Sequence, residues 1–272
     1  MITAILAGVV LRAVDLGGYS SEDREVVIME SALQLDRIIG LTTLSNASFS
    51  SPAVGKRNTS SIAGDTFYTA GNVVVRYNSE ENKQRGFYQL TDCSADSKST
   101  NSDGNAVSCI SVAPDGQYLA VGERALGNRG AAVHIYSVRS YKLLASSTSS
   151  TSGGHKFGVG CIGFLPGHSN RYLVSAGFKQ DKQLILWDTQ SSSEGGKNKL
   201  SLTIVGVFKI GNKVHSMSFH SSGLYFITAG DRHLKWWMVN QSPNQDSITL
   251  DGKAAGILEV KQLSFNSTSK LV

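Results

Sequence analysis

One stretch of the sequence has a spacing of glycines that could bind a nucleotide. Residues 158–163 read Gly-Val-Gly-Cys-Ile-Gly. In a dinucleotide-binding fold this pattern lies between a strand and a helix, because the helix N-terminus binds the pyrophosphate. Here Pro166 and Gly167 follow, which is typical of a turn and not of a helix. We therefore predict a β-strand at 158–163 and expect no cofactor there.

Six histidines could act as metal ligands or general bases, but their spacing supports neither role. They are His134, His155, His168, His215, His220 and His233. None lies in a His-x-x-x-His pattern, and none pairs with a cysteine at a spacing that binds zinc. No Gly-x-Ser-x-Gly motif is present, and Ser50 stands where a P-loop ending at Gly55 and Lys56 needs its first glycine. The sequence predicts no catalytic, metal-binding or cofactor-binding residue.

The charge of the chain is modest and dispersed. Its 26 basic and 21 acidic residues give a net charge of +5. A nucleic-acid-binding protein usually concentrates basic residues on one face and interleaves them with aromatic residues, and the sequence shows no such run. We therefore expect no nucleic-acid partner and no small-molecule substrate.

Neither the cysteines nor the N-terminus indicates secretion or a membrane anchor. Cys93, Cys109 and Cys161 are few and far apart, which favours a reducing compartment over a disulfide scaffold. Residues 2–11 are apolar, but Arg12 interrupts them and the run is too short to span a bilayer. We interpret this run as part of an extension and predict no membrane association.

An internal repeat contains the glycine-rich stretch and most of the histidines. Segments 107–122, 159–177 and 214–230 each contain an alternating apolar strand, a turn, a tyrosine and a second apolar strand that ends at glycine. A third strand follows each of them, at 133–138, 184–188 and 234–239, and a weaker copy lies at 66–77. The repeat predicts an all-β protein built of hairpins that each add one further strand.

One copy of the repeat resembles a WD repeat, because Gly154 and His155 open it and Trp187 and Asp188 close it. In WD repeats a histidine, a hydroxyl residue of the second strand, a turn aspartate and the tryptophan form a buried hydrogen-bonded tetrad. The resemblance assigns this structural tetrad to His155, Ser175, Asp181 and Trp187. Thr228, Asp231 and Trp237 form a partial tetrad in the next copy, where Ile210 occupies the histidine position. In the preceding copy Tyr136 replaces the tryptophan.

Further segments resemble the N-terminal propeller of the mitogen-activated-protein-kinase-binding WD-repeat scaffolds, which are related to echinoderm-microtubule-associated-like proteins. These segments are 35–41, 80–84, 154–159, 181–188 and 230–236, and the resemblance covers about residues 34–260. It implies a scaffold of the cytoplasm, the centrosome, the spindle pole or the cytoskeleton. Kinase docking in that family lies beyond the propellers, so this activity is not carried over.

The expected fold is an all-β WD40-repeat β-propeller of four to five blades that form an incomplete ring, because most WD propellers need about seven blades to close. We assign residues 1–32 to a poorly ordered N-terminal extension and residues 33–272 to the propeller. The blades are expected near 33–90, 105–145, 154–190 and 203–240, and a further blade begins at 255–272.

Two functions remain open from the sequence. The first is a non-catalytic protein–protein interaction scaffold for kinase signalling or spindle-pole assembly. The alternative is a microtubule- or cytoskeleton-binding protein whose positive charge contacts acidic surfaces. The implied partners are signalling kinases, or centrosomal and microtubule proteins.

Overall fold

A computed structural model of the 272-residue chain describes most of the predicted repeat region. The described residues are 3–6, 9–14, 32–38, 41, 49–51, 64–90, 105–125, 130–147, 154–189, 191–192, 199–241 and 248–256. They divide into two compact units, residues 1–41 and residues 42–272. The predicted further blade at 255–272 lies outside the described residues, except for its first two positions.

The first unit contains a three-stranded antiparallel sheet. Its strands are β1 (Thr3–Leu6), β2 (Val9–Val14) and β3 (Ala32–Ile38), in the order β1-β2-β3. The register joins Val9 to Ile38 and Val14 to Ala32. The structure therefore places residues 32–38 in this sheet, whereas the sequence predicts that the first blade begins near residue 33. The apolar run at 9–14 supplies the strand edge with which β3 pairs.

The second unit contains four antiparallel sheets of four strands each within its described residues. Blade 1 consists of β4 (Phe49–Ser50), β5 (Asp65–Ala70), β6 (Val73–Asn78) and β7 (Lys83–Gln89). Blade 2 consists of β8 (Ala106–Val112), β9 (Tyr118–Arg124), β10 (Val133–Ser137) and β11 (Leu143–Ser146). In both blades the chain runs from one strand to the adjacent one.

Blades 3 and 4 repeat this meander. Blade 3 consists of β12 (Val159–Phe164), β13 (Tyr172–Gly177), β14 (Gln183–Asp188) and β17 (Thr203–Lys209). A short ladder of β15 (Ser191–Ser192) and β16 (Lys199–Leu200) lies between its last two strands in the sequence. Blade 4 consists of β18 (Val214–Phe219), β19 (Tyr225–Gly230), β20 (His233–Gln241) and β21 (Ile248–Gly256).

The blades pack face to face through three apolar cores. Phe67 and Tyr88 of blade 1 meet Leu119 and Val121 of blade 2 in the first core. The second core joins blade 2 to Trp187 and its neighbours in blade 3, and the third joins blade 3 to Trp237 and its neighbours in blade 4. Alternation along each strand sends successive side chains to opposite faces, so a middle blade can contribute to two cores at once.

Close packing between blades requires glycine at particular positions. Gly223 lies in the hairpin turn between β18 and β19 and has a φ of +71°. A Cβ at this position would lie 1.9 Å from the Pro166 carbonyl oxygen of blade 3. The turn of blade 4 therefore lies directly against that of blade 3, and a side chain at Gly223 would separate them.

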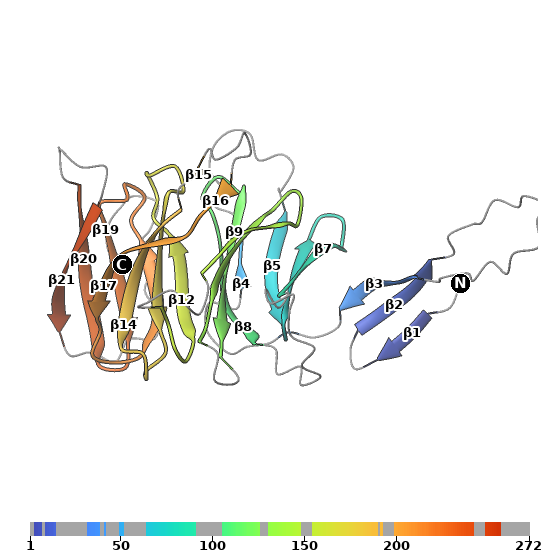
Figure 1. Ribbon diagram of the computed structural model, residues 1–272, viewed down its shortest axis with the longest axis horizontal. Coiled ribbons are helices and arrows are strands. Elements are labelled where there is room, and N and C mark those ends of the chain that lie inside the picture. Colours follow the sequence, from blue (N-terminus) through green and yellow to red (C-terminus); the bar gives the residue numbers. More distant parts are fainter. Residues whose placement is uncertain are drawn as a thin grey trace, which may run out of the picture. The chain divides into compact units, whose positions relative to one another are not determined.

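The four blades follow one another in chain order, and blade 1 and blade 4 lie at opposite ends of the described row (Figure 1). This arrangement confirms the predicted all-β propeller with an incomplete ring, and the described residues contain four of the predicted four to five blades. The repeated hairpins at 107–122, 159–177 and 214–230 are observed as β8-β9, β12-β13 and β18-β19. The glycine-rich stretch at 158–163 lies largely in β12 and precedes no helix.

Candidate functional site

Three of the four residues assigned to the blade 3 tetrad contact one another. His155 Nε2 lies 2.7 Å from the Ser175 hydroxyl, and Trp187 Nε1 donates to the same oxygen at 2.8 Å. All three side chains are buried. Because the serine oxygen accepts the indole hydrogen, its own hydrogen can be donated to His155 Nε2. Burial lowers the pKa of His155 to about 4, so the imidazole is neutral near pH 7.

Asp181 differs from the expected tetrad arrangement. Its carboxylate accepts hydrogen bonds from three successive backbone N–H groups, those of Lys156 (2.6 Å), Phe157 (3.2 Å) and Gly158 (3.1 Å). Among the described residues, His155 Nδ1 has no hydrogen-bond partner. Asp181 therefore fixes the backbone of the loop that leads into β12, and its hydrogen bonds do not extend to the imidazole.

Blade 4 contains an equivalent set of contacts that the sequence pattern only partly revealed. Trp237 Nε1 donates to the Thr228 hydroxyl at 2.9 Å, and His233 Nε2 lies 2.8 Å from the same oxygen. Ile210, where the repeat pattern lacks its histidine, is buried as an apolar residue. His233 supplies the imidazole from the start of β20, and burial lowers its pKa.

The third residue of the partial tetrad, Asp231, lies outside this buried group. Its carboxylate accepts a hydrogen bond from His215 Nε2 at 2.6 Å. The Asp231 side chain is 45% exposed, whereas Thr228 and Trp237 are buried. The hydrogen bond with His215 and the nearby positive charges lower the pKa of Asp231. The structure thus brings together two of the three predicted residues and adds His233.

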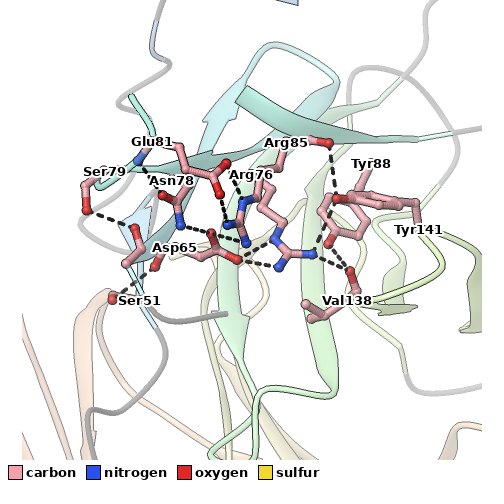
Figure 2. Close-up of polar contacts among 11 residues, drawn as sticks. Ser51, Asp65, Arg76, Asn78, Ser79, Glu81, Arg85, Tyr88, Val138 and Tyr141 are labelled. Atoms are coloured by element: carbon pink, nitrogen blue, oxygen red, sulfur yellow. Dashed lines mark hydrogen bonds and ion pairs between the residues drawn. The ribbon is translucent and has the colours of Figure 1, made fainter. Parts of the chain in front are cut away.

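A buried ionic cluster joins blade 1 to blade 2, and no repeat motif predicted it (Figure 2). The Asp65 carboxylate is fully buried, accepts from Arg76 Nε at 2.6 Å and forms an ion pair with Arg76 Nη2. Asn78 Nδ2 donates to the other carboxylate oxygen at 2.8 Å. Arg76 Nη1 donates to the carbonyl oxygen of Val138 in blade 2 at 3.1 Å. Arg76 is therefore a buried polar link between the two blades.

The sequence contained a signal that could have found this cluster. Gly71 and Asn72 form the turn between β5 and β6, and this turn fixes the register of the hairpin. That register places Asp65 opposite Asn78 and Phe67 opposite Arg76. A charged pair near the same end of a hairpin, inside an otherwise apolar blade, indicates a buried ion pair.

Blade 2 contains a second buried carboxylate. Glu123 Oε1 lies 2.7 Å from His134 Nε2, while Glu123 Oε2 accepts from Asn105 Nδ2 at 2.7 Å and from the Ala132 N–H at 3.0 Å. Burial alone would raise the pKa of Glu123, but its hydrogen bonds, that of His134 first, lower it. The carboxylate is therefore ionised near neutral pH and serves as an acceptor inside the fold.

The two described cysteines lie inside the fold. Cys109 and Cys161 are buried on β8 and β12, and burial raises the pKa of the Cys161 thiol to about 12. In the part of the chain that the structure describes, no group of three His, Cys, Asp or Glu residues is arranged to hold a metal ion. Within the same part, no helix is long and apolar enough to cross a membrane.

The geometry therefore defines a β-propeller in which blades 3 and 4 each contain a buried tryptophan–hydroxyl–histidine group. The family model "WD domain, G-beta repeat" matches residues 203–238, which include Thr228, His233 and Trp237. A chain in the crystal structure of the mitotic checkpoint complex matches 82% of this chain with a TM-score of 0.52 at 16% identity, over 55% of its own length. This chain has the fold of a WD-repeat β-propeller.

The similar proteins are much longer than this chain. WD repeat-containing protein 62 of Mus musculus is 28% identical over 79% of this chain and 11% of its own length. Mitogen-activated protein kinase-binding protein 1 of the same species is 27% identical over 89% of this chain and 14% of its own. Echinoderm microtubule-associated protein-like 4 of Xenopus tropicalis is 27% identical over 64% of this chain and 17% of its own. The chain thus spans less than a fifth of each of these relatives.

Proposed function

We propose that this chain is a non-catalytic scaffold that binds other proteins. The observation that carries the proposal is the placement of the polar side chains. The two buried histidines of blades 3 and 4 each hydrogen-bond to a hydroxyl that also accepts an indole hydrogen. Such groups stabilise blades, because a buried polar atom without a partner costs free energy. The loops at the ends of the blades are then the elements that can contact a partner.

The names of the similar proteins support a role in assembly and suggest which partners to test. One of them is named as a kinase-binding protein and another as microtubule-associated. From these names we propose signalling kinases or centrosomal proteins as the partners, and the cytoplasm, centrosome or spindle pole as the location. Fold alone does not determine function, so the partner has to be identified by experiment.

The test is quantitative binding by the purified 272-residue chain. Proteins captured by the tagged chain are purified and titrated against it by calorimetry, and at least one is expected to bind with defined stoichiometry. If none of the purified candidates binds, the scaffold proposal fails. Turnover in assays with hydrolase and nucleotide substrates would contradict the non-catalytic part, provided that the activity co-purifies with the chain.

A second candidate is direct binding to microtubules, which the microtubule-associated relative favours. With a net charge of +5, the chain would be attracted to an acidic filament surface. Co-sedimentation with microtubules that weakens as salt is raised would support this candidate. No co-sedimentation, or co-sedimentation that salt does not affect, would contradict the electrostatic form of it.

A further inference from the structure

One rim of the row of blades gathers exposed basic side chains from three consecutive blades. We define the entry rim as the loops that lead into β12 and β18, the turns that join β13 to β14 and β19 to β20, and the end of β9. Its basic residues are all exposed, and they are Arg124, Lys156, Lys179, Lys182, Lys213 and Arg232. In the described ranges none of the six forms an ion pair.

Backbone hydrogen bonds hold these segments together across the blades. Arg124 forms a β-bridge with Gly158, and the Ala125 N–H donates to the Phe157 carbonyl oxygen at 3.1 Å. These contacts join the end of blade 2 to the loop of blade 3. Arg124 of blade 2 and Lys156 of blade 3 therefore lie on one continuous surface.

The same continuity extends from blade 3 to blade 4. Within blade 3 the Ile210 N–H donates to the Lys182 carbonyl oxygen at 3.0 Å, and within blade 4 the Asp231 N–H donates to the Lys213 carbonyl oxygen at 3.0 Å. The short segment 210–213 joins these two blades, so both hydrogen bonds lie at one junction. His215 first, and then Lys213 and Lys179, lower the pKa of Asp231, so charges from both blades act on one carboxylate. Lysines that lie far apart in the sequence are thus neighbours on this rim.

The carboxylates of the entry rim are already engaged. Asp181 accepts three backbone hydrogen bonds, and Asp231 accepts one from His215. Glu123, which precedes Arg124, is buried against His134. The six exposed basic side chains also outnumber these three carboxylates, so the described rim residues carry an excess of positive charge.

An exposed aromatic ring lies among these charges. Phe157 is 50% exposed. The Asp181 carboxylate accepts hydrogen bonds from the N–H groups of Phe157 and Gly158, and the Phe157 carbonyl oxygen accepts one from the Ala125 N–H. An apolar side chain on a fixed backbone can anchor a partner with little loss of conformational entropy, and the surrounding lysines add electrostatic attraction.

We propose that the entry rim binds an acidic, extended protein segment that places an apolar side chain against Phe157. This inference rests on the proposed scaffold function and adds the surface and the chemistry of the partner. A phosphate group fits the rim less well, because the three consecutive N–H groups that could cradle an anion already bind Asp181. Nucleic acid would also require several exposed aromatic rings for stacking, and among the described rim residues Phe157 is exposed whereas Phe178 is partly buried.

The test uses the full chain and a fluorescein-labelled, glutamate-rich peptide with one central leucine, measured by fluorescence anisotropy. The wild-type chain is expected to bind this peptide more weakly as salt is raised, and to bind hardly at all when glutamine replaces the glutamates. Lys179→Glu combined with Lys213→Glu should weaken binding about tenfold or more, and Phe157→Ser should weaken it about fivefold.

The matched control reverses two exposed lysines outside the entry rim, Lys83→Glu and Lys142→Glu, and should change binding less than about twofold. Urea unfolding of each variant checks that the blades are intact, and Lys→Gln versions replace any variant that fails this check. Equal weakening by rim and control reversals would overturn the proposal, because only net charge would then matter. No binding of the glutamate peptide at low salt would overturn it as well.

Two further outcomes separate this proposal from others. If a single-stranded oligonucleotide displaces the peptide and binds more tightly to the rim, the surface recognises nucleic acid and the proposal is overturned. If a purified protein partner binds the wild type and the rim variants equally well, the scaffold function stands and the rim proposal fails. If no purified partner binds, the scaffold function fails whatever the peptide does.

Discussion

Trp237 and Thr228 are joined by a hydrogen bond of 2.9 Å between the indole Nε1 and the threonine hydroxyl. The hydroxyl lies on β19 and the indole on β20, with a diagonal offset between the paired strands. Trp187 and Ser175 have the same relationship on β14 and β13, at 2.8 Å. In each blade a histidine also contacts the hydroxyl that accepts the indole hydrogen, so the three-residue group is a repeated structural unit.

Thr228→Val should destabilise the chain, because it keeps the shape of the side chain and removes the shared hydroxyl. The indole N–H and the imidazole of His233 would then both be buried without this partner, at a cost of about 1–3 kcal/mol. The midpoint of urea unfolding measures the loss. Thr203→Val on β17 is the control, because Thr203 is exposed. Equal midpoints for the two variants would remove the stabilising role of the group.

His155 should make the stability of the chain depend on pH. Its pKa is lowered to about 4 by burial, against 6.5 in an unfolded chain. Between these values the unfolded state binds more protons than the folded state. The contribution of neutral His155 to the free energy of unfolding is therefore full above about pH 6.5 and is lost as the pH falls toward 4. The change amounts to roughly 3 kcal/mol. His155→Gln should reduce the slope of unfolding free energy against pH in this range, and an unchanged slope would contradict the assignment.

Asp181→Ala should loosen the loop that leads into β12. Three backbone N–H groups lose their acceptor, and we expect a global cost of about 1 kcal/mol, because these groups can partly turn to water. Hydrogen exchange at residues 156–158 should become faster. Asp251→Ala, which alters an exposed carboxylate on β21, is the control. If exchange at residues 156–158 is unchanged, the loop is held by other contacts.

Arg76→Met should be among the most damaging substitutions in blade 1. It leaves the fully buried Asp65 carboxylate without its closest cationic partner, which typically costs about 3–5 kcal/mol. The double variant with Asp65→Asn should lose less than the sum of the two single variants. Arg85→Met is the control, because Arg85 is more exposed and its ion pair with Asp65 is longer at 3.5 Å, so a smaller loss is expected. Additive losses in chemical denaturation would show that Asp65 and Arg76 act independently.

Gly223→Ala should separate blades 3 and 4 locally. Alanine at a positive φ costs about 1 kcal/mol, and here its Cβ would also meet the Pro166 carbonyl oxygen. Gly71→Ala is a matched control, because Gly71 has a φ of +65° and its added Cβ would contact nothing within 4 Å. The difference between the two melting temperatures reports the packing of the blades. Equal losses of melting temperature in the two variants would mean that the turns of blades 3 and 4 can move apart without a cost in free energy.

The repeated hairpins could be predicted from the sequence because strand alternation and turn residues are local properties. The resemblance to WD repeats, and not the spacing alone, assigned Trp187, Ser175 and His155 to one group. His233 was missed because the repeat pattern places its histidine before the first strand, whereas the backbone of blade 4 brings an imidazole to the same hydroxyl from the third strand. The position of a side chain in space, and not its position in the motif, determines which residue completes the group.

The sequence by itself thus determined the all-β repeat and its hairpins, because periodicity and turn chemistry are properties of neighbouring residues. Only the tertiary structure decided that Asp181 binds backbone N–H groups, that Arg76 links blade 1 to blade 2, and that lysines from separate repeats share one rim with Phe157. These relationships join segments far apart in the chain. They depend on how the blades pack, which local patterns do not encode.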